Sequence, residues 1–367
     1  MKAAKLAVRI GLSLGVSVLF IWLSLRNTDV RAVGSAILKA DPRRVLAYLG
    51  LLLVVHLIRT VRWGMLLRPL GRISFKRLNS ASAVGFMLLM LLPFRLGEFA
   101  RPLLIARPPP GQPGARLKRS GAMASCVVER VIDGISVGLL GVVALRLLGQ
   151  SVSGHYAAFA RKAALLVAVG FFGLCVALAA AYFLRERALR LVRAVVSLVS
   201  PRLAERAADI LDAFISALHL GSPWKVLGVL ALTAAYWGTA AYGLALLAPA
   251  FGMKLGPLMA ATVLAVQVVG VMVPAGPGMV GTLQFFTQMG LSLFVPGALS
   301  DPAASVPAAA FANTVWLLQL GQQIGLGVAF LLAGHVSLRG ILSKDAALAD
   351  EPDPPRGAGA AEARAAS

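Results

Sequence analysis

Charged residues are scarce in this chain of 367 residues, and acidic ones are the scarcest. Asp, Glu, Lys and Arg make up 14% of the sequence, with only 15 acidic residues against 36 basic ones. Soluble domains carry about 25% charged residues. Four stretches contain no charged residue at all and exceed the roughly 20 residues that span a bilayer: 163–184, 226–253, 255–300 and 302–338. This pattern excludes an ordinary soluble enzyme and predicts an all-α, polytopic integral membrane protein.

Cysteine and histidine are also rare. The two cysteines, Cys126 and Cys175, lie in apolar runs, and the four histidines are scattered without metal-ligand spacing. Two such cysteines indicate neither a disulfide framework nor a zinc site, so we expect no metal, no cofactor and no catalytic residue. The net charge of +21 has no aromatic-basic patch beside it. It therefore favours anionic lipid headgroups and membrane topology over nucleic acid.

The apolar runs predict about six spanning helices and two re-entrant hairpins. We place the spans at about 10–25, 45–67, 120–145, 163–184, 226–250 and 308–333, and the hairpins at 78–107 and 256–295. The first run resembles a signal peptide, but no small-residue cleavage site follows it, so we interpret it as an uncleaved span. A basic amphipathic helix over 185–220 is expected to lie in the membrane interface.

The basic residues predict which side each loop occupies. With both termini cytoplasmic and both hairpins re-entrant, 26 of the 36 Lys and Arg residues fall in cytoplasmic segments, as the positive-inside rule requires. Arg59 and Arg62 are expected at that interface, where they set the topology. The sequence therefore predicts a multi-pass protein of the cytoplasmic membrane.

A shift of 181 residues reveals a weak internal repeat, because it places Gly71 on Gly252, Pro93 on Pro274 and Gly97 on Gly278. Each half then has three spans and one hairpin, and an odd number of spans inverts the second half. Inverted repeats with broken helices are typical of secondary transporters. We expect a first membrane repeat at 1–160, a second at 161–335 and a disordered cytoplasmic tail at 336–367.

Three acidic residues stand inside the apolar region, each beside an arginine. Glu98 and Arg101 are three residues apart and are expected to pair on one helix face, with Arg95 at the hairpin tip. Glu129 and Asp133 are four residues apart and share a face, with Arg130 between them. Ionisable groups inside a membrane are costly and mark a site by default, and arginine forks match phosphate groups. The same pairs could instead be a purely structural network.

The second hairpin is interrupted by proline and glycine. Its tip contains Pro274, Gly276, Pro277 and Gly278, and a helix that restarts after Gly278 would carry Gln284 in its first two turns, within reach of a cavity. Broken backbone in a membrane must be satisfied by protein or by a wet cavity. The restarting helix would direct its N-terminal donors at the tip, where an anion could bind. A kinked helix pair without a ligand is the alternative.

These motifs resemble the flippase-like family of the lysylphosphatidylglycerol synthase transmembrane region. The resemblance rests on P-F-R-L-G-E-F-A-R at 93–101, E-R-V-I-D at 129–133 and P-A-G-P-G-M-V-G-T-L-Q at 274–284, and it covers about residues 5–335. It implies an integral membrane protein associated with lipid translocation. Met279 and Gln284 stand where relatives often have glycine and an acid, so coupling through an acid at 284 is not expected. Nothing after Leu338 could supply the soluble aminoacyl-transferase domain of bifunctional relatives, so lipid synthesis is not expected.

The first hypothesis is a flippase or transporter for an anionic, aminoacylated or polyprenyl-phosphate-linked lipid. Arginines would contact the headgroup, carboxylates would orient them, and the hairpin tips would form the gate. The substrate-binding set is Arg95, Glu98, Arg101, Glu129, Arg130 and Asp133, and the gate set is Pro93, Gly97, Pro274, Gly276, Pro277, Gly278 and Gln284.

Two alternatives remain open. One is a non-transporting subunit of a lipid-glycosylation or lipid-modification complex, with a lipid-modifying enzyme as its partner. The other is an intramembrane enzyme that acts on a lipid phosphate. Such an enzyme needs a base–nucleophile pair or an acidic metal motif in the pocket, and the sequence has neither near these motifs, so the chain is not expected to be an enzyme.

Overall fold

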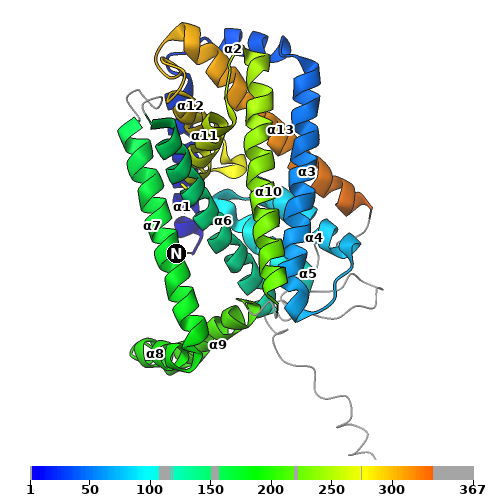
Figure 1. Ribbon diagram of the computed structural model, residues 1–367, viewed down its shortest axis with the longest axis vertical. Coiled ribbons are helices and arrows are strands. Elements are labelled where there is room, and N and C mark those ends of the chain that lie inside the picture. The colour runs from blue at the N-terminus through cyan, green and yellow to red at the C-terminus, as the bar shows by residue number, and fades with distance from the viewer. Residues whose placement is uncertain are drawn as a thin grey trace, which may run out of the picture.

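A computed structural model describes residues 2–106, 117, 119–149, 157–218, 222–273 and 275–333. All regular structure within these ranges is helical (Figure 1). Four helical segments are long and apolar enough to cross a membrane, and there are six if two bent pairs each count as one span. The prediction of an all-α, multi-pass membrane fold is therefore confirmed.

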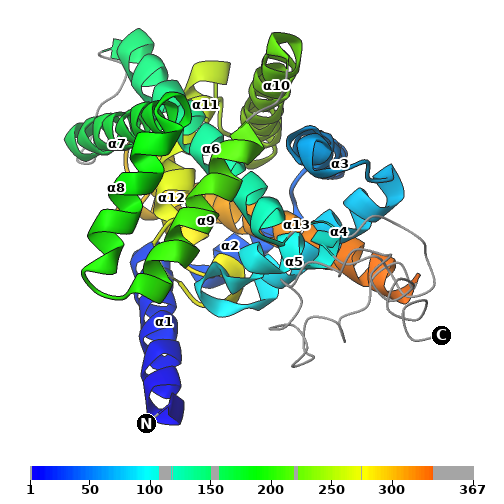
Figure 2. The same ribbon diagram turned by 90° about the horizontal axis from the view of Figure 1, so that it is seen from below.

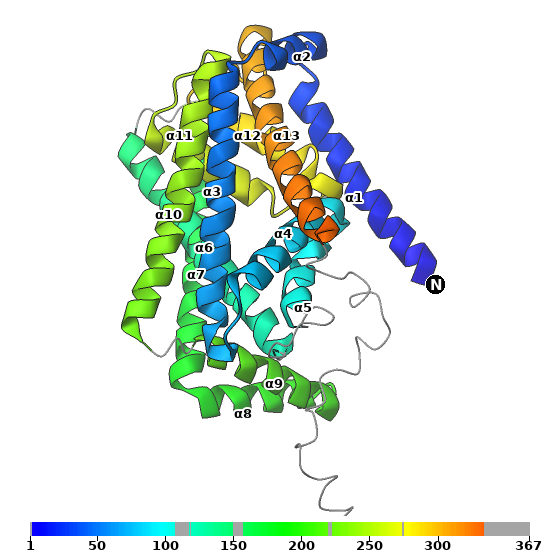
Figure 3. The same cartoon turned by 90° about the vertical axis from the view of Figure 1, so that its right-hand side faces the viewer.

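Four long helices form the body of the molecule: α3 (Pro42–Leu67), α6 (Arg119–Leu148), α10 (Pro223–Leu247) and α13 (Pro302–Leu332). Proline occupies the first turn of α3, α10 and α13, where its missing N–H group has no helical partner to lose. The side chains of Asp41 and Asp301 accept backbone N–H groups at the starts of α3 and α13. Helices α3 and α10 run side by side along the long axis (Figures 1 and 3).

The N-terminal helix α1 (Lys2–Leu25) packs on the second hairpin. Ser17 Oγ accepts the N–H of Gly276 at 2.9 Å, and Ser24 Oγ accepts from the Gln288 carboxamide. The Phe20 ring contacts the rings of Phe285 and Phe286. Helix α2 (Val30–Leu38) follows at an angle of 81° to α1 and lies across the top of the molecule in Figure 1. The first apolar run is thus part of the folded body.

The first hairpin consists of α4 (Phe75–Leu91), the 3₁₀ helix η2 (Pro93–Phe99) and α5 (Ala100–Ala106). Arg77 Nη2 near its start donates to the carbonyl of Ile105 near its end at 2.6 Å, so the chain returns to the side from which it entered. Gly85 permits this close packing, because a Cβ atom there would lie 2.7 Å from Arg101 Cβ.

The second hairpin consists of α11 (Pro257–Gly270), the short 3₁₀ helix η5 (Pro277–Met279) and α12 (Thr282–Leu291). Gly290 lies against the backbone of Val263, and Gly270 lies against the Phe286 ring, so α11 and α12 are antiparallel. In Figure 3 the second hairpin lies in the upper half of the molecule and the first hairpin in the lower half, above α8 and α9. Their tips meet, since Arg95 Nη1 donates to the Val271 carbonyl at 3.1 Å.

The amphipathic segment forms two helices, so the prediction of a single helix over 185–220 is wrong. After α7 (Ala157–Phe183) the chain bends by 108° into α8 (Arg185–Ser197), turns at 198–200 and continues as α9 (Pro201–Leu218). Pro201 opens α9, because proline fits the start of a helix but not its interior. Arg185–Asp212 and Arg193–Glu205 ion pairs join the two helices. The pair lies across the lower end of α7 (Figures 1 and 2).

Both halves of the chain repeat one order of elements: a long helix, a 3₁₀ turn, a glycine with positive φ, a hairpin and another long helix. The glycines are Gly71 (φ 151°) and Gly252 (φ 72°), which the shift of 181 residues superposes. Helix α4 contacts α13, and α11 contacts α6. The inversion of one half relative to the other and the boundary near 160 stay predictions. The expected tail at 336–367 lies outside the described residues.

Candidate functional site

A buried ion-pair network joins α3 to α6 at the centre of the molecule. Arg62 Nη1 lies 2.6 Å from Asp133 Oδ1 and Nη2 lies 3.0 Å from Asp133 Oδ2, so the guanidinium binds this carboxylate in a bidentate manner. The same Nη2 donates to Glu129 Oε1 at 2.9 Å, and Nη1 donates to Thr233 Oγ1 of α10 at 3.2 Å. Arg62 and Glu129 are fully buried. Such two-pronged contacts are geometrically specific as well as strong.

Arg101 completes the network from the first hairpin. Its Nη2 pairs with Glu129 Oε2, the oxygen that Arg62 does not use. Its guanidinium lies 4.0 Å from the centre of the Trp63 ring, which suits a cation over an aromatic face. Glu129 therefore stands between two arginines that come from different helices.

The expected pairing of Glu98 with Arg101 is wrong. Arg95 Nη2 lies 2.6 Å from Glu98 Oε1, and Arg101 turns away to Glu129. The reason is local geometry: residues 93–99 form a tight 3₁₀ turn in which Arg95 has a φ of 57°, outside regular helical geometry. Within this turn the Arg95 side chain reaches Glu98, while Arg101 belongs to the α-helix that follows.

Arg59 and Arg130 carry the positive charge that the carboxylates do not balance. Arg59 makes no ion pair within the described ranges; its guanidinium lies 3.9 Å from the Phe86 ring centre, and its buried Nε has no hydrogen-bond partner. Arg130 reaches Asp133 only at 3.6 Å, and its side chain is 37% exposed. Five arginines thus surround three carboxylates: Arg59, Arg62, Arg95, Arg101 and Arg130, with Glu98, Glu129 and Asp133.

Two cavities meet at this cluster. The upper cavity, of about 440 Å³, lies between α3, α10, α11 and α13 and is lined by Arg59, Arg95, Arg130 and Asp133 among others. The lower cavity, of about 790 Å³, lies between the first hairpin, α6 and α9 and is lined by Arg101, Glu129 and Arg130. Phe86, Leu89, Glu98 and Arg130 line both cavities. The charged cluster is therefore the partition between them.

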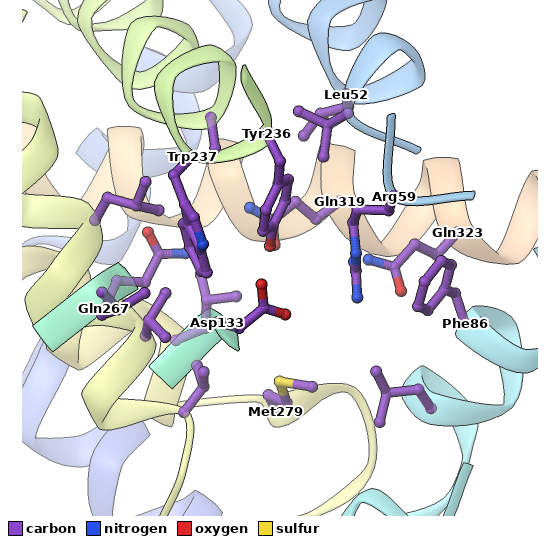
Figure 4. Close-up of a pocket in the computed structure, with 18 of the residues that line it drawn as sticks. Leu52, Arg59, Phe86, Asp133, Tyr236, Trp237, Gln267, Met279, Gln319 and Gln323 are labelled. Carbon is purple, nitrogen blue, oxygen red and sulfur yellow. The ribbon is translucent and has the colours of Figure 1, made fainter. Parts of the chain in front are cut away.

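The polar groups of the upper cavity come from several helices and converge. Figure 4 shows Arg59, Asp133, Tyr236 and Gln323 pointing into the same space from α3, α6, α10 and α13. The walls around them are largely apolar. All six residues of the predicted substrate-binding set line one or both cavities.

Five of the expected gate residues lie at the two hairpin tips: Pro93, Gly97, Gly276, Pro277 and Gly278. Pro274 is outside the described residues, and Gln284 lies within α12. Pro93 opens η2 and Pro277 opens η5. Gly97 lies so close to α4 that a Cβ atom would be 2.1 Å from the Leu89 backbone nitrogen. The Gly276 N–H is held by α1, and the Gly278 carbonyl accepts from Trp316 Nε1 at 2.8 Å. The tips are anchored to other helices in this conformation.

Gln284 does not face either cavity, and that expectation is wrong. Helix α12 begins at Thr282 rather than after Gly278, and Gln284 Oε1 accepts the Gly281 N–H at 2.8 Å, closing the helix start. The side chain that lines the upper cavity from this tip is Met279. Met279 has a φ of 52°, in the left-handed region that glycine adopts more easily.

Arg59 and Arg62 were expected at the membrane interface, and the structure instead places them at the site. Helix α3 continues past them for more than a turn, and Trp63, Leu66 and Leu67 are fully buried. The signal in the sequence is this apolar run W-G-M-L-L after Arg62, which shows that the arginines lie inside the span and not at its end.

Comparison with known proteins adds one match. The family model described as the lysylphosphatidylglycerol synthase TM region matches residues 10–320. It covers every residue of the ion-pair network and both hairpins. No curated protein and no solved structure matches the chain.

Proposed function

The chain belongs to the family of the lysylphosphatidylglycerol synthase transmembrane region, and from this membership and the geometry of the site we propose that it translocates a lipid with an anionic headgroup. The family makes the protein a lipid-related membrane protein. The proposal is that an anionic phosphate of the headgroup binds at the arginine cluster between the two cavities.

The observation that carries the proposal is the charge excess of the cluster. Five arginines against three carboxylates leave two positive charges unbalanced in a largely apolar interior. Uncompensated charge is expensive where water is scarce. A phosphate would balance it, because guanidinium groups bind phosphate oxygens through paired N–H donors. Arg59 and Arg130 are the arginines with donors to spare.

The second support is the placement of the cluster. Because the two cavities share Phe86, Glu98 and Arg130, a headgroup bound at the partition touches both. A shift of the hairpin tips, which contact each other through Arg95 and Val271, would open one side and close the other. In transporters with inverted repeats, helices broken near the midplane usually form the substrate site.

We also propose an orientation in the cytoplasmic membrane. The basic helices α8 and α9 and the loop after α3 lie at the lower end of the molecule in Figure 1, and a cytoplasmic location of this end agrees with the positive-inside rule. Both termini are then cytoplasmic. The lower cavity opens toward the cytoplasmic leaflet, next to α9.

Reconstitution of the purified full chain into liposomes tests the proposal. Labelled phosphatidic acid, phosphatidylglycerol and phosphatidylcholine are placed in the inner leaflet, and their arrival outside is followed by quenching with dithionite. Protein-dependent movement of the two anionic lipids, faster than that of phosphatidylcholine, is expected. The proposal assigns no covalent chemistry to the site, so the lipids should be recovered unchanged.

The same assay separates the rival roles. A protein that moves no lipid alone but co-purifies with a lipid-modifying enzyme would favour the non-transporting subunit. A chemically altered lipid would favour the intramembrane enzyme. Either result would overturn translocation as the function of the isolated chain.

A further inference from the structure

The upper cavity contains buried polar atoms without hydrogen-bond partners. They are two acceptors and two donors: Gln267 Oε1, Gln323 Oε1, Trp237 Nε1 and Gln322 Nε2. The whole side chains of Gln267 and Trp237 are buried, at 4% and 7% exposed. Buried polar groups are nearly always satisfied, and each unsatisfied one costs about 1–3 kcal/mol. All four residues line the cavity.

These neutral groups lie beside the charged cluster and not within it. Gln267 and Trp237 come from α11 and α10, while Gln322 and Gln323 come from α13. Figure 4 shows Gln267 and Trp237 on one side of Asp133 and the Gln323 carboxamide next to Arg59. The cavity therefore offers a cationic region and, around it, amide and indole groups with aromatic faces.

We propose that the upper cavity recognises a phosphate esterified to a polyhydroxylated ring, such as a hexose or inositol. This inference rests on the proposed function and names its substrate class. The phosphate binds Arg59 and Arg130. The ring hydroxyls satisfy the orphaned amide and indole atoms, because a hydroxyl both donates and accepts. The faces of Tyr236 and Trp237 pack against the C–H surface of the ring.

The donor and acceptor pattern separates this class from an aminoacylated headgroup. An ammonium group has only donors, so it would leave the donors Trp237 Nε1 and Gln322 Nε2 without an acceptor. The two carboxylates that line the cavity, Asp133 and Glu98, are already paired with Arg62 and Arg95. An ammonium would also add charge to a site that already has an excess of arginine. The cavity volume of about 440 Å³ is in the range of small-molecule sites.

Native mass spectrometry of the full chain in phosphatidylcholine nanodiscs tests the inference. One arm compares dioctanoyl phosphatidylinositol with dioctanoyl phosphatidic acid; the other compares a short prenyl phosphate with its hexosyl ester. In at least one arm, the ring-bearing lipid should bind about tenfold more tightly than its partner, the effect of one or two buried hydrogen bonds. The arm that shows the preference identifies the source of the ring.

Variants connect the preference to the cavity. Gln267→Leu and Gln323→Leu should each remove most of the tenfold preference and leave binding of phosphatidic acid unchanged. Asn313→Leu is the matched control, because Asn313 lies on α13 but bonds the Ala309 carbonyl and does not line the cavity. It should keep the preference.

The outcomes distinguish the inference from the proposed function. If both lipids of each pair bind equally tightly and anionic lipids still bind, recognition of the ring is refuted, while the proposed translocation of anionic lipids is not. Loss of all anionic binding overturns both. If Gln267→Leu and Gln323→Leu both keep the preference for the ring-bearing lipid, the ring binds elsewhere and its assignment to the upper cavity is refuted. If a variant fails to fold, the wild-type comparison alone still decides whether the ring is recognised.

Discussion

The guanidinium of Arg62 and the carboxylate of Asp133 form a buried bidentate ion pair between α3 and α6, with Nη1–Oδ1 and Nη2–Oδ2 distances of 2.6 and 3.0 Å. Arg62 is fully buried, and it also bonds Glu129 and Thr233. One side chain thus links three long helices. Because both Nη atoms of Arg62 donate to side chains of other helices, Arg62 is the structural centre of the network, in contrast to Arg59 beside it.

Replacement of Arg62 should destabilise the fold. Arg62→Ala leaves two buried carboxylates with too few partners, and loss of one member of a buried pair costs about 3–5 kcal/mol. Arg62→Lys keeps the charge but loses the fork, so it should fall between Arg62→Ala and wild type. Melting of the purified proteins in detergent measures this. A wild-type melting temperature for Arg62→Ala would show that the network does not hold the helices together.

Double-mutant cycles should distinguish the two candidate partners of Arg101. Arg101→Ala and Glu129→Gln should be non-additive in unfolding free energy, within the range of about 0.5–3 kcal/mol found for contacting residues. Arg101→Ala and Glu98→Gln should be additive within about 0.5 kcal/mol, because Glu98 pairs with Arg95. Non-additivity for Arg101 with Glu98, and additivity for Arg101 with Glu129, would instead support the Glu98–Arg101 pair that the sequence suggests.

Replacement of Met279 by glycine should destabilise the protein less than replacement by alanine. Its φ of 52° is unfavourable for any residue with a Cβ atom, by about 1–2 kcal/mol. Both Met279→Ala and Met279→Gly remove the side chain, so their difference isolates the backbone term. Met279→Gly should therefore be more stable than Met279→Ala by about 1 kcal/mol, measured by denaturant unfolding. A more stable alanine variant would mean that this tip does not hold the left-handed conformation.

Much of the fold could be predicted from the sequence because hydrophobic length is a local property. Uncharged runs such as 226–250 and 308–333 match α10 and α13 closely, and Pro93 and Gly278 mark the breaks at the two tips. The split of the amphipathic segment was not predicted, although Pro201 marks it. Helical periodicity continues across a short turn when both helices present an apolar face, so the pattern alone did not show the turn.

The site was only half predictable, because pairing is a tertiary property. Sequence spacing indicates which residues are neighbours on one helix. It therefore predicts correctly that Glu129 and Asp133 share a helix face, and wrongly that Glu98 pairs with Arg101. The true partners, Arg62 and Arg101, lie 67 and 28 residues from Glu129. No local pattern reveals such distances. The orphaned amides of the upper cavity, Gln267 and Gln323, are equally invisible before the helices are assembled.

Cysteine labelling should place the lower end of the molecule in the cytoplasm. Ser74→Cys and Ser197→Cys, both exposed near α4 and at the end of α8, should be protected from an impermeant reagent added to intact cells. Ser35→Cys, exposed on α2, should react. The background must lack Cys126 and Cys175. Reaction at Ser74→Cys but not at Ser197→Cys would place these ends on opposite sides and contradict the hairpin.

The central claim is that an anionic headgroup passes through the arginine cluster, and lipid movement by Arg59 variants tests it most directly. Arg59→Gln removes one of the two unbalanced charges without breaking an ion pair of the described network, whereas Arg59→Lys keeps that charge. An exposed arginine changed in the same way, Arg72→Gln, is the control. In liposomes, Arg59→Gln should move phosphatidic acid at least about tenfold more slowly than wild type, with Arg59→Lys intermediate and Arg72→Gln unchanged. Undiminished movement of phosphatidic acid by a stable Arg59→Gln protein would contradict the account.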